Sequence, residues 1–476
     1  MSEGRGRQNY IDGVWQASAS PAAIPVVNPA TELVIAEAVA SSEADAARAA
    51  SAARKAFDRW SQTPVAERIA LLERVRAGIE ARADELAGLI TAEMGCPIGF
   101  SRAAQIGLAV GDIRATLAVA AELDDRVLGR SIVQNDPVGV VVAITPWNFP
   151  LHQILAKIAP ALAAGCTVVL KPSEVTPLDA VILAEIFHAA GTPPGVFNMV
   201  LGGRETGAAL VARPEVDMVS FTGSTRGGRA VAEIAGRELK KAALELGGKS
   251  ANIILDDADL EKVIPAALGQ SFINSGQVCA ALSRLIVPES RRAEVEAIAV
   301  EAAKSWTLGD PTDPANRLGP LANRAQQEKV RQAIGGAMQE GATLLCGGPD
   351  QPAGLPKGAY VSPTILSHVT RAMAIFREET FGPVLSVIGY ADERDAIWIA
   401  NDSQYGLSGG VWSESLERAE GVARQMRTGQ VILNGASLDL AAPFGGVKQS
   451  GLGRENGRYG LEEYCSPKAI TRPIRA

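Results

Sequence analysis

The fold is decided by the stretch VGVVVAITPWNFPLHQILAKIAPALAAGCTVVLKPSE, residues 138–174. Its β-branched run 138–144 predicts a buried strand, residues 151–163 predict a helix, and residues 167–170 predict a second strand. Each predicted strand is followed at once by a turn that contains proline. A strand, a helix and a strand of these lengths make one βαβ unit, so the stretch predicts a parallel, doubly wound sheet.

The alternation of strands and helices continues through most of the chain. Further strands are predicted at 196–200, 216–221, 251–255, 282–287 and 384–390, and further helices at 42–60, 64–94, 177–190, 205–212, 225–238, 289–305 and 393–401. Because 476 residues exceed one ordinary core, we expect two α/β domains. The polar stretch 124–134 and the proline-punctuated tail 464–476 interrupt the pattern, and either is suited to pairing with another subunit.

Composition and charge exclude several classes of protein. The chain carries 53 acidic and 46 basic residues, a net charge of −7, and no Lys/Arg stripe, so a nucleic-acid partner is not expected. The N-terminus, residues 1–12, is polar, and no later apolar stretch reaches the about 18 residues of a membrane span. We therefore expect no signal peptide and no membrane span, and the predicted location is the cytoplasm.

The cysteines and histidines predict neither a disulfide framework nor a metal site. The five cysteines are scattered and odd in number, and the three histidines are isolated: Cys96, Cys166, Cys279, Cys346, Cys465, His152, His188 and His368. No zinc-ligand spacing is present among them. Reduced thiols and no metal are expected.

Two strand ends carry groups suited to a nucleotide. Residues 221–228, Phe-Thr-Gly-Ser-Thr-Arg-Gly-Gly, follow a predicted strand and open a predicted helix, where backbone N–H groups can hold a phosphate. The spacing from Gly223 to Gly228 is not the dinucleotide fingerprint, so a plain strand-to-helix turn stays open as an alternative. Lys171 and Glu174 directly follow another strand and can reach ribose hydroxyls, or else form a solvated charged turn.

Three further residues are candidates for chemistry. Asn148 lies at a strand end between two prolines, where a stiffly held amide can donate to an oxyanion or simply satisfy the turn. Cys279 follows small and polar residues, as a nucleophilic thiol requires, although a cysteine beside Val and Ala is often only a buried apolar group. Glu245, between two leucines, is suited to a semi-buried general base or to an ion pair with Lys249.

Taken together and in order, these segments resemble those of the aldehyde dehydrogenase superfamily over essentially the whole chain. The matching segments are Pro146-Trp147-Asn148-Phe149-Pro150, Lys171-Pro172-Ser173-Glu174, residues 221–228, Glu245-Leu246-Gly247-Gly248-Lys249-Ser250, Gly276-Gln277-Val278-Cys279, residues 378–384 and residues 443–451. One departure is Arg226-Gly227, where the family commonly has an acidic and then an aliphatic residue. It bears on how the following helix holds a pyrophosphate.

The resemblance implies the chemistry of a non-acylating, NAD(P)-dependent aldehyde dehydrogenase. Cys279 is expected to attack the aldehyde carbon, Asn148 to stabilise the oxyanion, and Glu245 to activate the water that hydrolyses the resulting thioester. A proton relay through Lys157 and Glu455 is also implied. The cofactor is expected to be NAD, with NADP possible, because Glu174 would face a 2′-phosphate.

The resemblance also implies which residues bind the cofactor and the aldehyde. The expected cofactor residues are Ile144, Trp147, Lys171, Ser173, Glu174, Gly223, Ser224, Leu246, Glu379 and Phe381. The expected substrate pocket consists of Phe149, Gln153 and Ala156, of which the last two are small or polar and predict a roomy pocket. Which aldehyde enters this pocket is left open.

The expected fold has a Rossmann-like cofactor-binding domain, a second α/β catalytic domain and a small β oligomerisation element. Their predicted limits are 1–123 with 138–247, then 248–450, and finally 124–137 with 451–476. A homodimer or homotetramer is implied. Three other functions stay open: a thiol hydrolase without cofactor, a non-catalytic scaffold, and a coenzyme-A-acylating relative. Glu245 favours water as the acyl acceptor over coenzyme A.

Overall fold

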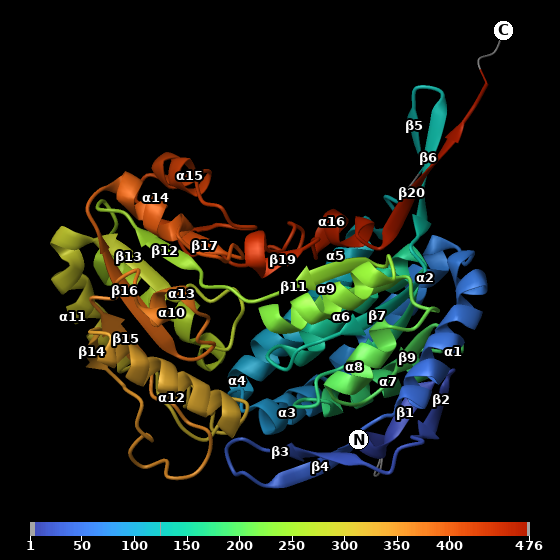
Figure 1. The fold of residues 1–476 in the computed structure, drawn as a ribbon, viewed down its shortest axis with the longest axis horizontal. Helices are drawn as coiled ribbons and strands as arrows, with labels where there is room; N and C mark the ends of the chain where they lie inside the picture. Colours follow the sequence, from blue (N-terminus) through green and yellow to red (C-terminus); the bar gives the residue numbers. More distant parts are fainter. Residues whose placement is uncertain (1–4, 124, 474–476) are drawn as a thin grey trace.

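Two α/β domains lie side by side in the computed structural model, and a β-hairpin projects from the first of them (Figure 1). The structure describes residues 5–123 and 125–473. The parts of the expected domains that fall on residues 1–4, 124 and 474–476 lie outside the described residues. The predicted α/β class is confirmed: two mixed sheets carry helices on their faces, and a small antiparallel sheet accompanies them.

The first sheet has the order β19-β11-β10-β7-β8-β9-β1-β2. Its five central strands are mutually parallel. Antiparallel strands flank them at both ends. The bounds are β7 (Val140–Ile144), β8 (Thr167–Lys171), β9 (Phe197–Met199), β10 (Met218–Thr222), β11 (Lys241–Glu245), β1 (Gln8–Ile11), β2 (Val14–Ala17) and β19 (Gly451–Leu452). Four central strands match the sequence prediction, whereas β11 was missed because a lysine and two alanines begin it.

Helices cover both faces of this sheet (Figure 1). They are α1 (Glu43–Ser61), α2 (Val65–Ala81), α3 (Ala83–Met94), α4 (Ile98–Phe100), the π-helical turn η2 (Ser101–Gln105), α5 (Ile106–Ala120), α6 (Pro150–Ala164), α7 (Leu178–Ala189), α8 (Arg204–Val211), α9 (Thr225–Arg237) and α16 (Gly457–Glu462). The single helix expected at 64–94 is wrong. Arg82, at φ −112° and ψ 20°, leaves the helical region and separates α2 from α3. Its side chain donates hydrogen bonds to Glu85 and Glu185. No glycine or proline lies at this break, so the sequence pattern did not predict it.

The second sheet has the order β14-β15-β16-β13-β12-β17-β18. All of its pairings are parallel except β14 with β15. The strands are β12 (Ala251–Ile254), β13 (Arg284–Pro288), β14 (Thr343–Cys346), β15 (Thr364–Ser367), β16 (Val384–Tyr390), β17 (Gly409–Trp412) and β18 (Ile432–Leu433). The helices are α10 (Leu260–Phe272), α11 (Arg292–Ala303), α12 (Arg324–Gln339), α13 (Ala374–Arg377), α14 (Glu393–Asn401) and α15 (Leu416–Ala423). Short 3-10 turns are η1 (Arg5–Arg7), η3 (Ile273–Gly276), η4 (Glu289–Arg291) and η5 (Lys448–Ser450).

The projecting element pairs two distant parts of the chain. Strands β5 (Arg126–Leu128) and β6 (Ser131–Pro137) form a hairpin, and β20 (Cys465–Thr471) adds to β6 in antiparallel register. The range 451–476 does not go as a whole with this element. Its first part returns to the first domain, where β19 joins the first sheet and α16 packs on α5 and α6. Among the described residues of that range, β20 alone shares a sheet with β5 and β6, and the domain limits stay predictions.

Within residues 5–123 and 125–473, one helical run is long and apolar enough, by length and composition alone, to cross a membrane. It spans Ile98–Ala120, with 44% of its most apolar window buried in the protein. The expectation that no such stretch exists was therefore wrong. Asp112 and Arg114 interrupt the run of apolar residues, but the run as a whole stays apolar. The run packs against α2, α6 and α16, and Asp112 is bonded to His152 of α6. It is part of the core of the first domain.

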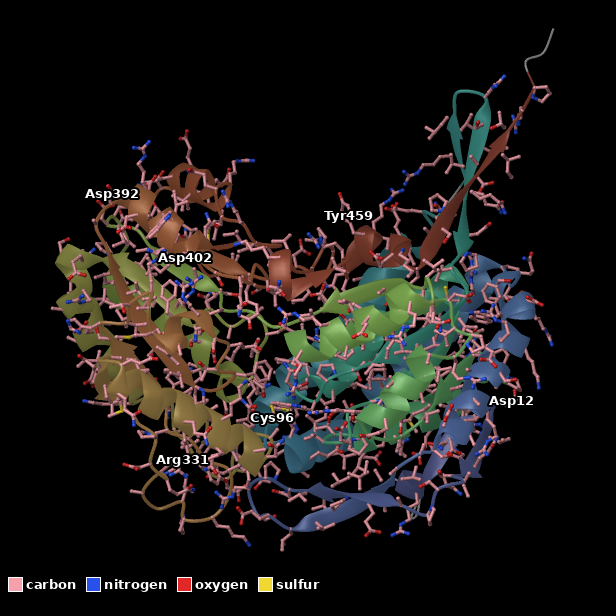
Figure 2. The ribbon with its side chains drawn as sticks, in the orientation of Figure 1. Asp12, Cys96, Arg331, Asp392, Asp402 and Tyr459 are labelled. Atoms are coloured by element: carbon pink, nitrogen blue, oxygen red, sulfur yellow. The ribbon has the colours of Figure 1, made fainter. Side chains whose placement is uncertain are left out.

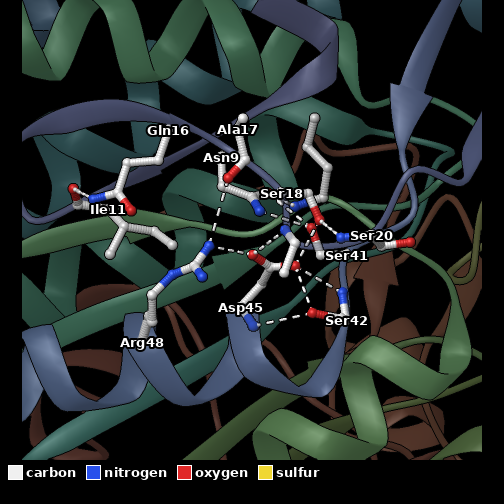
Figure 3. A network of polar contacts seen from close by, with 12 residues as sticks. Asn9, Ile11, Gln16, Ala17, Ser18, Ser20, Ser41, Ser42, Asp45 and Arg48 are labelled. Atoms are coloured by element: carbon white, nitrogen blue, oxygen red, sulfur yellow. Dashed lines mark hydrogen bonds and ion pairs between the residues drawn. The ribbon is translucent and has the colours of Figure 1, made fainter.

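A buried polar network attaches the N-terminal strands to α1 (Figure 3). Ser42 and Asp45 form a reciprocal capping box at the start of this helix. The Asp45 carboxylate also accepts hydrogen bonds from Ser18 Oγ at 2.6 Å and from the backbone of Ala19. The helix predicted at 42–60 is thus present, and its first turn also orders the segment before it.

The two domains meet closely around Cys96, which Figure 2 labels between them. Gly95 ends α3 with φ +83°, and a Cβ there would lie 2.6 Å from Cγ of Pro320 in the second domain. The N-terminal arm adds a second contact: strands β3 (Ala23–Val27) and β4 (Val34–Val39) run along the lower edge of the first domain in Figure 1, and their connecting turn reaches the second domain. The loop joining them accepts a hydrogen bond at Pro29 O from Ala359 N, at 2.9 Å. These contacts set the width of the space between the domains.

Candidate active site

The carboxyl ends of β7, β10 and β11 point toward the space between the domains, and two cavities lie there. The inner cavity, about 170 Å³, is lined by Pro146, Trp147, Asn148, Thr222, Gly223, Ser224, Leu246, Gly247, Cys279, Gln326, Lys329, Glu379 and Phe381. The outer cavity, about 350 Å³, is lined by residues that include Ile144, Lys171, Ser173, Glu174, Arg204, Phe221, Arg226 and Ile234. Both contain Thr222 and Ser224, so they adjoin each other.

The loop before Cys279 has an unusual backbone. Asn274 and Ser275 have φ of 55° and 54°, and Gly276 continues the left-handed run at 71°. A Cβ on Gly276 would lie 2.0 Å from the carbonyl oxygen of Gly382, so glycine is required there. The side chain of Gln277, fully buried, accepts a hydrogen bond from Ala322 N at 2.9 Å. The loop that carries the thiol is therefore held rigidly.

Asn148 is buried and held from both sides. Its carbonyl oxygen accepts hydrogen bonds from Gln105 Nε2 at 3.0 Å and from Asn274 Nδ2 at 2.9 Å. Its own Nδ2 donates to the carbonyl oxygen of Gln277 at 3.0 Å. A side-chain amide carries two N–H groups, so one donor of Asn148 is left for another acceptor in the cavity that it lines with Cys279.

The thiol and the nearby carboxyl groups strongly perturb one another. Burial, followed by the charges of Glu245, Glu379 and Glu455, raises the pKa of the Cys279 thiol to about 12. Burial and the charge of Glu455 raise the pKa of Glu245 well above its usual range. Both carboxylate oxygens of Glu245 are buried and have no hydrogen-bond partner among the described residues. A buried, unpartnered carboxyl group with a raised pKa has the properties of a general base.

Lys157 and Glu455 form a buried ion pair beside this group. Their side chains are 1% and 7% exposed, and the Lys157 ammonium donates to Glu455 Oε1. Both charges act on Glu245, Lys157 by lowering its pKa and Glu455 by raising it. The sequence-predicted relay residues are therefore electrostatic neighbours of the candidate base.

Glu379 and Phe381 also line the inner cavity. Glu379 Oε1 accepts a hydrogen bond from Gly248 N at 3.0 Å. A Cβ on Gly247 would lie 2.4 Å from Glu379 Oε2, so the glycine leaves room for this carboxylate. The ring of Phe381 packs edge-on against Trp147, with 5.4 Å between ring centroids. The inner cavity thus holds a carboxylate and two aromatic rings together with Cys279.

The outer cavity is lined by the segment after β8 and by the first turn of α9. Lys171 Nζ lies 3.4 Å from Glu174 Oε2 and donates to the carbonyl oxygen of Pro172 at 3.0 Å. Burial, opposed by Glu174, lowers the pKa of Lys171. Ser224 is the N-cap of α9, and its Oγ accepts from Gly227 N. A charged pair and a helix N-terminus therefore face one space, as the binding of a nucleotide requires.

A family comparison identifies the chain. Residues 15–470 match the family model described as the aldehyde dehydrogenase family. The chain belongs to the aldehyde dehydrogenase family. It is an oxidoreductase that converts an aldehyde to the carboxylic acid, as the resemblance predicted.

Individual aldehyde dehydrogenases resemble it over nearly their whole length. A 3-succinoylsemialdehyde-pyridine dehydrogenase from Pseudomonas sp is 50% identical, with 98% of each chain covered. A mutant of aldehyde dehydrogenase C from Pseudomonas syringae, solved with NAD+ and octanal, has a TM-score of 0.97 at 46% identity and covers 100% of this chain and 99% of that one. A Mycobacterium tuberculosis aldehyde dehydrogenase, solved with NAD+, has a TM-score of 0.96 at 40% identity, with 98% of each covered. NAD+ is thus bound in homologous structures.

All ten predicted cofactor residues of this aldehyde dehydrogenase line one of the two cavities. The three predicted substrate residues do not: Phe149, Gln153 and Ala156 are buried along α6, outside the linings of both cavities. Sequence reasoning missed Gln326 and Lys329, which α12 brings to the inner cavity, and Arg204 of α8, which lines the outer one. Neither helix follows a recognisable motif, so no local signal marked these residues.

A metal site is not evident in the part of the chain that the structure describes. Within residues 5–123 and 125–473, no group of three or more His, Cys, Asp or Glu could hold a metal ion. All five cysteines are free in this aldehyde dehydrogenase, and Cys96, Cys166 and Cys465 are buried. Cys279 is the one cysteine among the residues that line the inner cavity.

Proposed function

We propose that this chain oxidises its aldehyde through a thioester on Cys279, with Asn148 as the oxyanion donor and Glu245 as the base. One observation carries the proposal: the inner cavity holds Cys279, Asn148 and Glu379 together and adjoins the outer cavity that holds Lys171 and Glu174. A thiol placed between an amide donor and a nucleotide-sized space matches aldehyde oxidation better than hydrolysis, which has no need of the second cavity.

The first step is attack of Cys279 on the aldehyde carbon. Because burial and three carboxyl groups hold the pKa of this thiol at about 12, its proton must be removed by a neighbouring base. Glu245, whose own pKa is raised by burial, can accept this proton, but we assign Glu245 mainly to the hydrolysis that follows. The free N–H of Asn148 and the backbone N–H of Cys279 then donate to the oxyanion of the tetrahedral adduct.

The second step is hydrolysis of the thioester. Glu245 accepts a proton from water as the water attacks the acyl carbon, and Cys279 leaves as thiolate. Neither carboxylate oxygen of Glu245 has a hydrogen-bond partner among the described residues, so either oxygen can accept a hydrogen bond from the attacking water. The proton passes toward the buried pair of Lys157 and Glu455, whose charges already act on Glu245.

The residues around both cavities fit NAD. Glu379 and Phe381 would hold the nicotinamide end, Ser224 and the N-terminus of α9 the pyrophosphate, and Lys171 and Glu174 the adenosine ribose. Bound NAD+ supplies the hydride acceptor that converts the adduct into the thioester.

NAD is preferred over NADP in this proposal because Glu174 would face the 2′-phosphate of NADP. Arg204 and Arg226 line the same cavity and oppose that effect, so the preference is graded.

The aldehyde enters from the side of α6, where Phe149, Gln153 and Ala156 form its pocket. Relatives in the family act on unlike aldehydes, since octanal is bound in one and another is named for a pyridine semialdehyde. Both would need a wide pocket, as a small alanine and a polar glutamine on this helix predict.

The protein assembles as a homodimer or homotetramer in the cytoplasm. The strand pair β5–β6 and β20 projects from the body in Figure 1 and exposes Val127 and Leu128, at 68% and 63%. Apolar side chains on a projecting sheet are typical of a subunit interface.

Product analysis tests the proposed reaction. The purified protein is incubated with an aldehyde panel and NAD+, with and without coenzyme A, and acid, acyl-coenzyme A and NADH are measured together. Equal yields of acid and NADH, unaffected by coenzyme A, are expected. Acyl-coenzyme A as the main product would make the enzyme an acylating one, and ester hydrolysis without aldehyde oxidation would make it a hydrolase.

A further inference from the structure

His152 lies in the first turn of α6, four residues after Asn148, which is bonded to the nucleophile loop. Asn148 and Phe149 precede this helix, and the rings of Phe149 and His152 pack edge-on with 6.0 Å between centroids. His152 is the third residue of α6 and therefore lies in its first turn, next to the segment that holds Asn148. It shares the face of α6 that carries Phe149, Gln153 and Ala156, the proposed aldehyde pocket.

His152 is bound to a buried carboxylate. Its Nδ1 is 2.6 Å from Asp112 Oδ2, and the two side chains are 11% and 1% exposed. Asp112 Oδ1 is buried and has no partner among the described residues. A buried carboxylate with a single partner is stabilised chiefly by the charge of that partner, which favours the imidazolium form of His152.

The surroundings of His152 raise its pKa on balance. Burial alone would lower the pKa of His152, but the charge and hydrogen bond of Asp112, aided by Glu455 and opposed by Lys157, raise it above its ordinary value. With Nδ1 occupied by Asp112, the protonated ring presents one further donor, Nε2–H. This nitrogen has no hydrogen-bond partner among the described residues, and the side chain keeps some exposure.

We infer that His152, oriented by Asp112, is a specificity-determining residue that donates a hydrogen bond from Nε2 to an acceptor atom in the tail of the aldehyde. The inference rests on the proposed function, since it places the aldehyde along α6. The substrate class is an aldehyde that carries a carbonyl oxygen or an aromatic ring nitrogen a few bonds from the reacting carbon. An unbranched alkyl or phenyl tail would leave the Nε2 donor unpaired, which disfavours its binding.

A matched pair of aldehydes tests the inference. We would measure kcat/KM with NAD+ for 3-(pyridin-3-yl)propanal and 3-phenylpropanal, which differ by one ring nitrogen, in the wild type and in His152→Leu. The wild type is expected to prefer the pyridyl aldehyde by about tenfold or more. His152→Leu should bring the ratio close to one. The control is His188→Leu, an exposed histidine of α7 remote from the site, which should keep the wild-type ratio.

The pH profile of the same ratio tests the role of Asp112. The ionisation of catalytic groups affects both aldehydes equally and cancels in the ratio of kcat/KM values. The ratio therefore depends on pH only through the protonation of His152. The preference should be lost as pH rises through the raised pKa of His152, above its ordinary value of about 6.5. Asp112→Asn removes the charge that raises this pKa, so the loss should move to lower pH.

The outcomes separate the two hypotheses. Turnover of both aldehydes with a wild-type ratio near one, or an unchanged ratio in His152→Leu, overturns this inference and leaves the proposed function intact. Turnover of neither aldehyde, while other aldehydes of the panel are oxidised, overturns this inference alone, whereas turnover of no aldehyde in the panel overturns both. If His152→Leu does not fold, the wild-type ratio and its pH profile still decide.

Discussion

Asn148 Nδ2 donates a 3.0 Å hydrogen bond to the carbonyl oxygen of Gln277, two residues before Cys279. The bond joins the turn after β7, in the first domain, to the nucleophile loop between α10 and β13, in the second. Asn274 Nδ2 strengthens the same link by donating to Asn148 O at 2.9 Å. The proposed oxyanion donor and the thiol are therefore placed relative to each other only when both domains have folded and docked.

Replacement of Cys279 by alanine should abolish aldehyde oxidation. Removing a covalent nucleophile is expected to lower kcat by about 10³-fold or more, while NAD binding persists because the cofactor residues are untouched. NADH absorbance reports turnover, and titration calorimetry reports binding. Cys346→Ala, which removes a half-buried thiol of β14, is the matched control and should stay active. Full activity in Cys279→Ala would refute its assignment.

Glu245→Gln should separate the two halves of the reaction. Because Glu245 is assigned mainly to hydrolysis, the variant should release one equivalent of NADH per site and then stall as an acyl-enzyme. Stopped-flow absorbance measures the burst, and intact mass spectrometry detects the adduct.

Two results would revise the role of Glu245. A burst lost together with turnover would show that the carboxylate is also needed to deprotonate the Cys279 thiol, whose pKa of about 12 makes that step demanding. Unimpaired steady-state turnover would remove Glu245 from the mechanism. Glu414→Gln, an exposed carboxylate of the second domain, serves as the control.

Glu174→Gln should weaken the preference for NAD over NADP. A partly screened contact between Glu174 and a 2′-phosphate costs about 1 to 2 kcal/mol, or about one decade in kcat/KM. The variant should gain NADP activity more than it loses NAD activity. Arg226→Gln, on the same cavity, should do the reverse if the guanidinium offsets Glu174. A wild type that favours NADP, or a ratio unchanged in Glu174→Gln, would mean that Glu174 does not face the 2′ position.

Sedimentation should show a homodimer or homotetramer at micromolar concentration. Leu128→Asp places a charge on the projecting sheet, where the native side chain is 63% exposed, and should shift the protein toward smaller species. Leu416→Asp, at a 56% exposed leucine that begins α15, is the control and should not change the assembly. A monomeric wild type would exclude the proposed interface.

The sequence was informative where function depends on strand ends. Lys171 ends β8, and Ser224 and Leu246 follow β10 and β11. The carboxyl ends of parallel strands meet at one edge of a sheet, whatever the loops do. The order of motifs along the chain therefore predicted which residues line the two cavities. It also predicted β16 and α14 with their observed bounds, since their apolar periodicity is regular.

Other features came from contacts that local sequence does not encode. The break at Arg82 follows from its ion pairs with Glu85 and Glu185, and the pairing of His152 with Asp112 depends on how α5 packs on α6.

By itself the sequence determined the alternation of elements, the chemistry of the nucleophile and base motifs, and the edge of the sheet where they gather, because strand and helix periodicity and residue type act locally. Only the tertiary structure decided that Gln326 and Lys329 reach the inner cavity and that Arg204 and Arg226 line the same cavity as Glu174. It also decided that contact between the two domains places Cys279 beside Asn148. These are long-range contacts, and their distances are set by the packing of whole elements across the domain boundary.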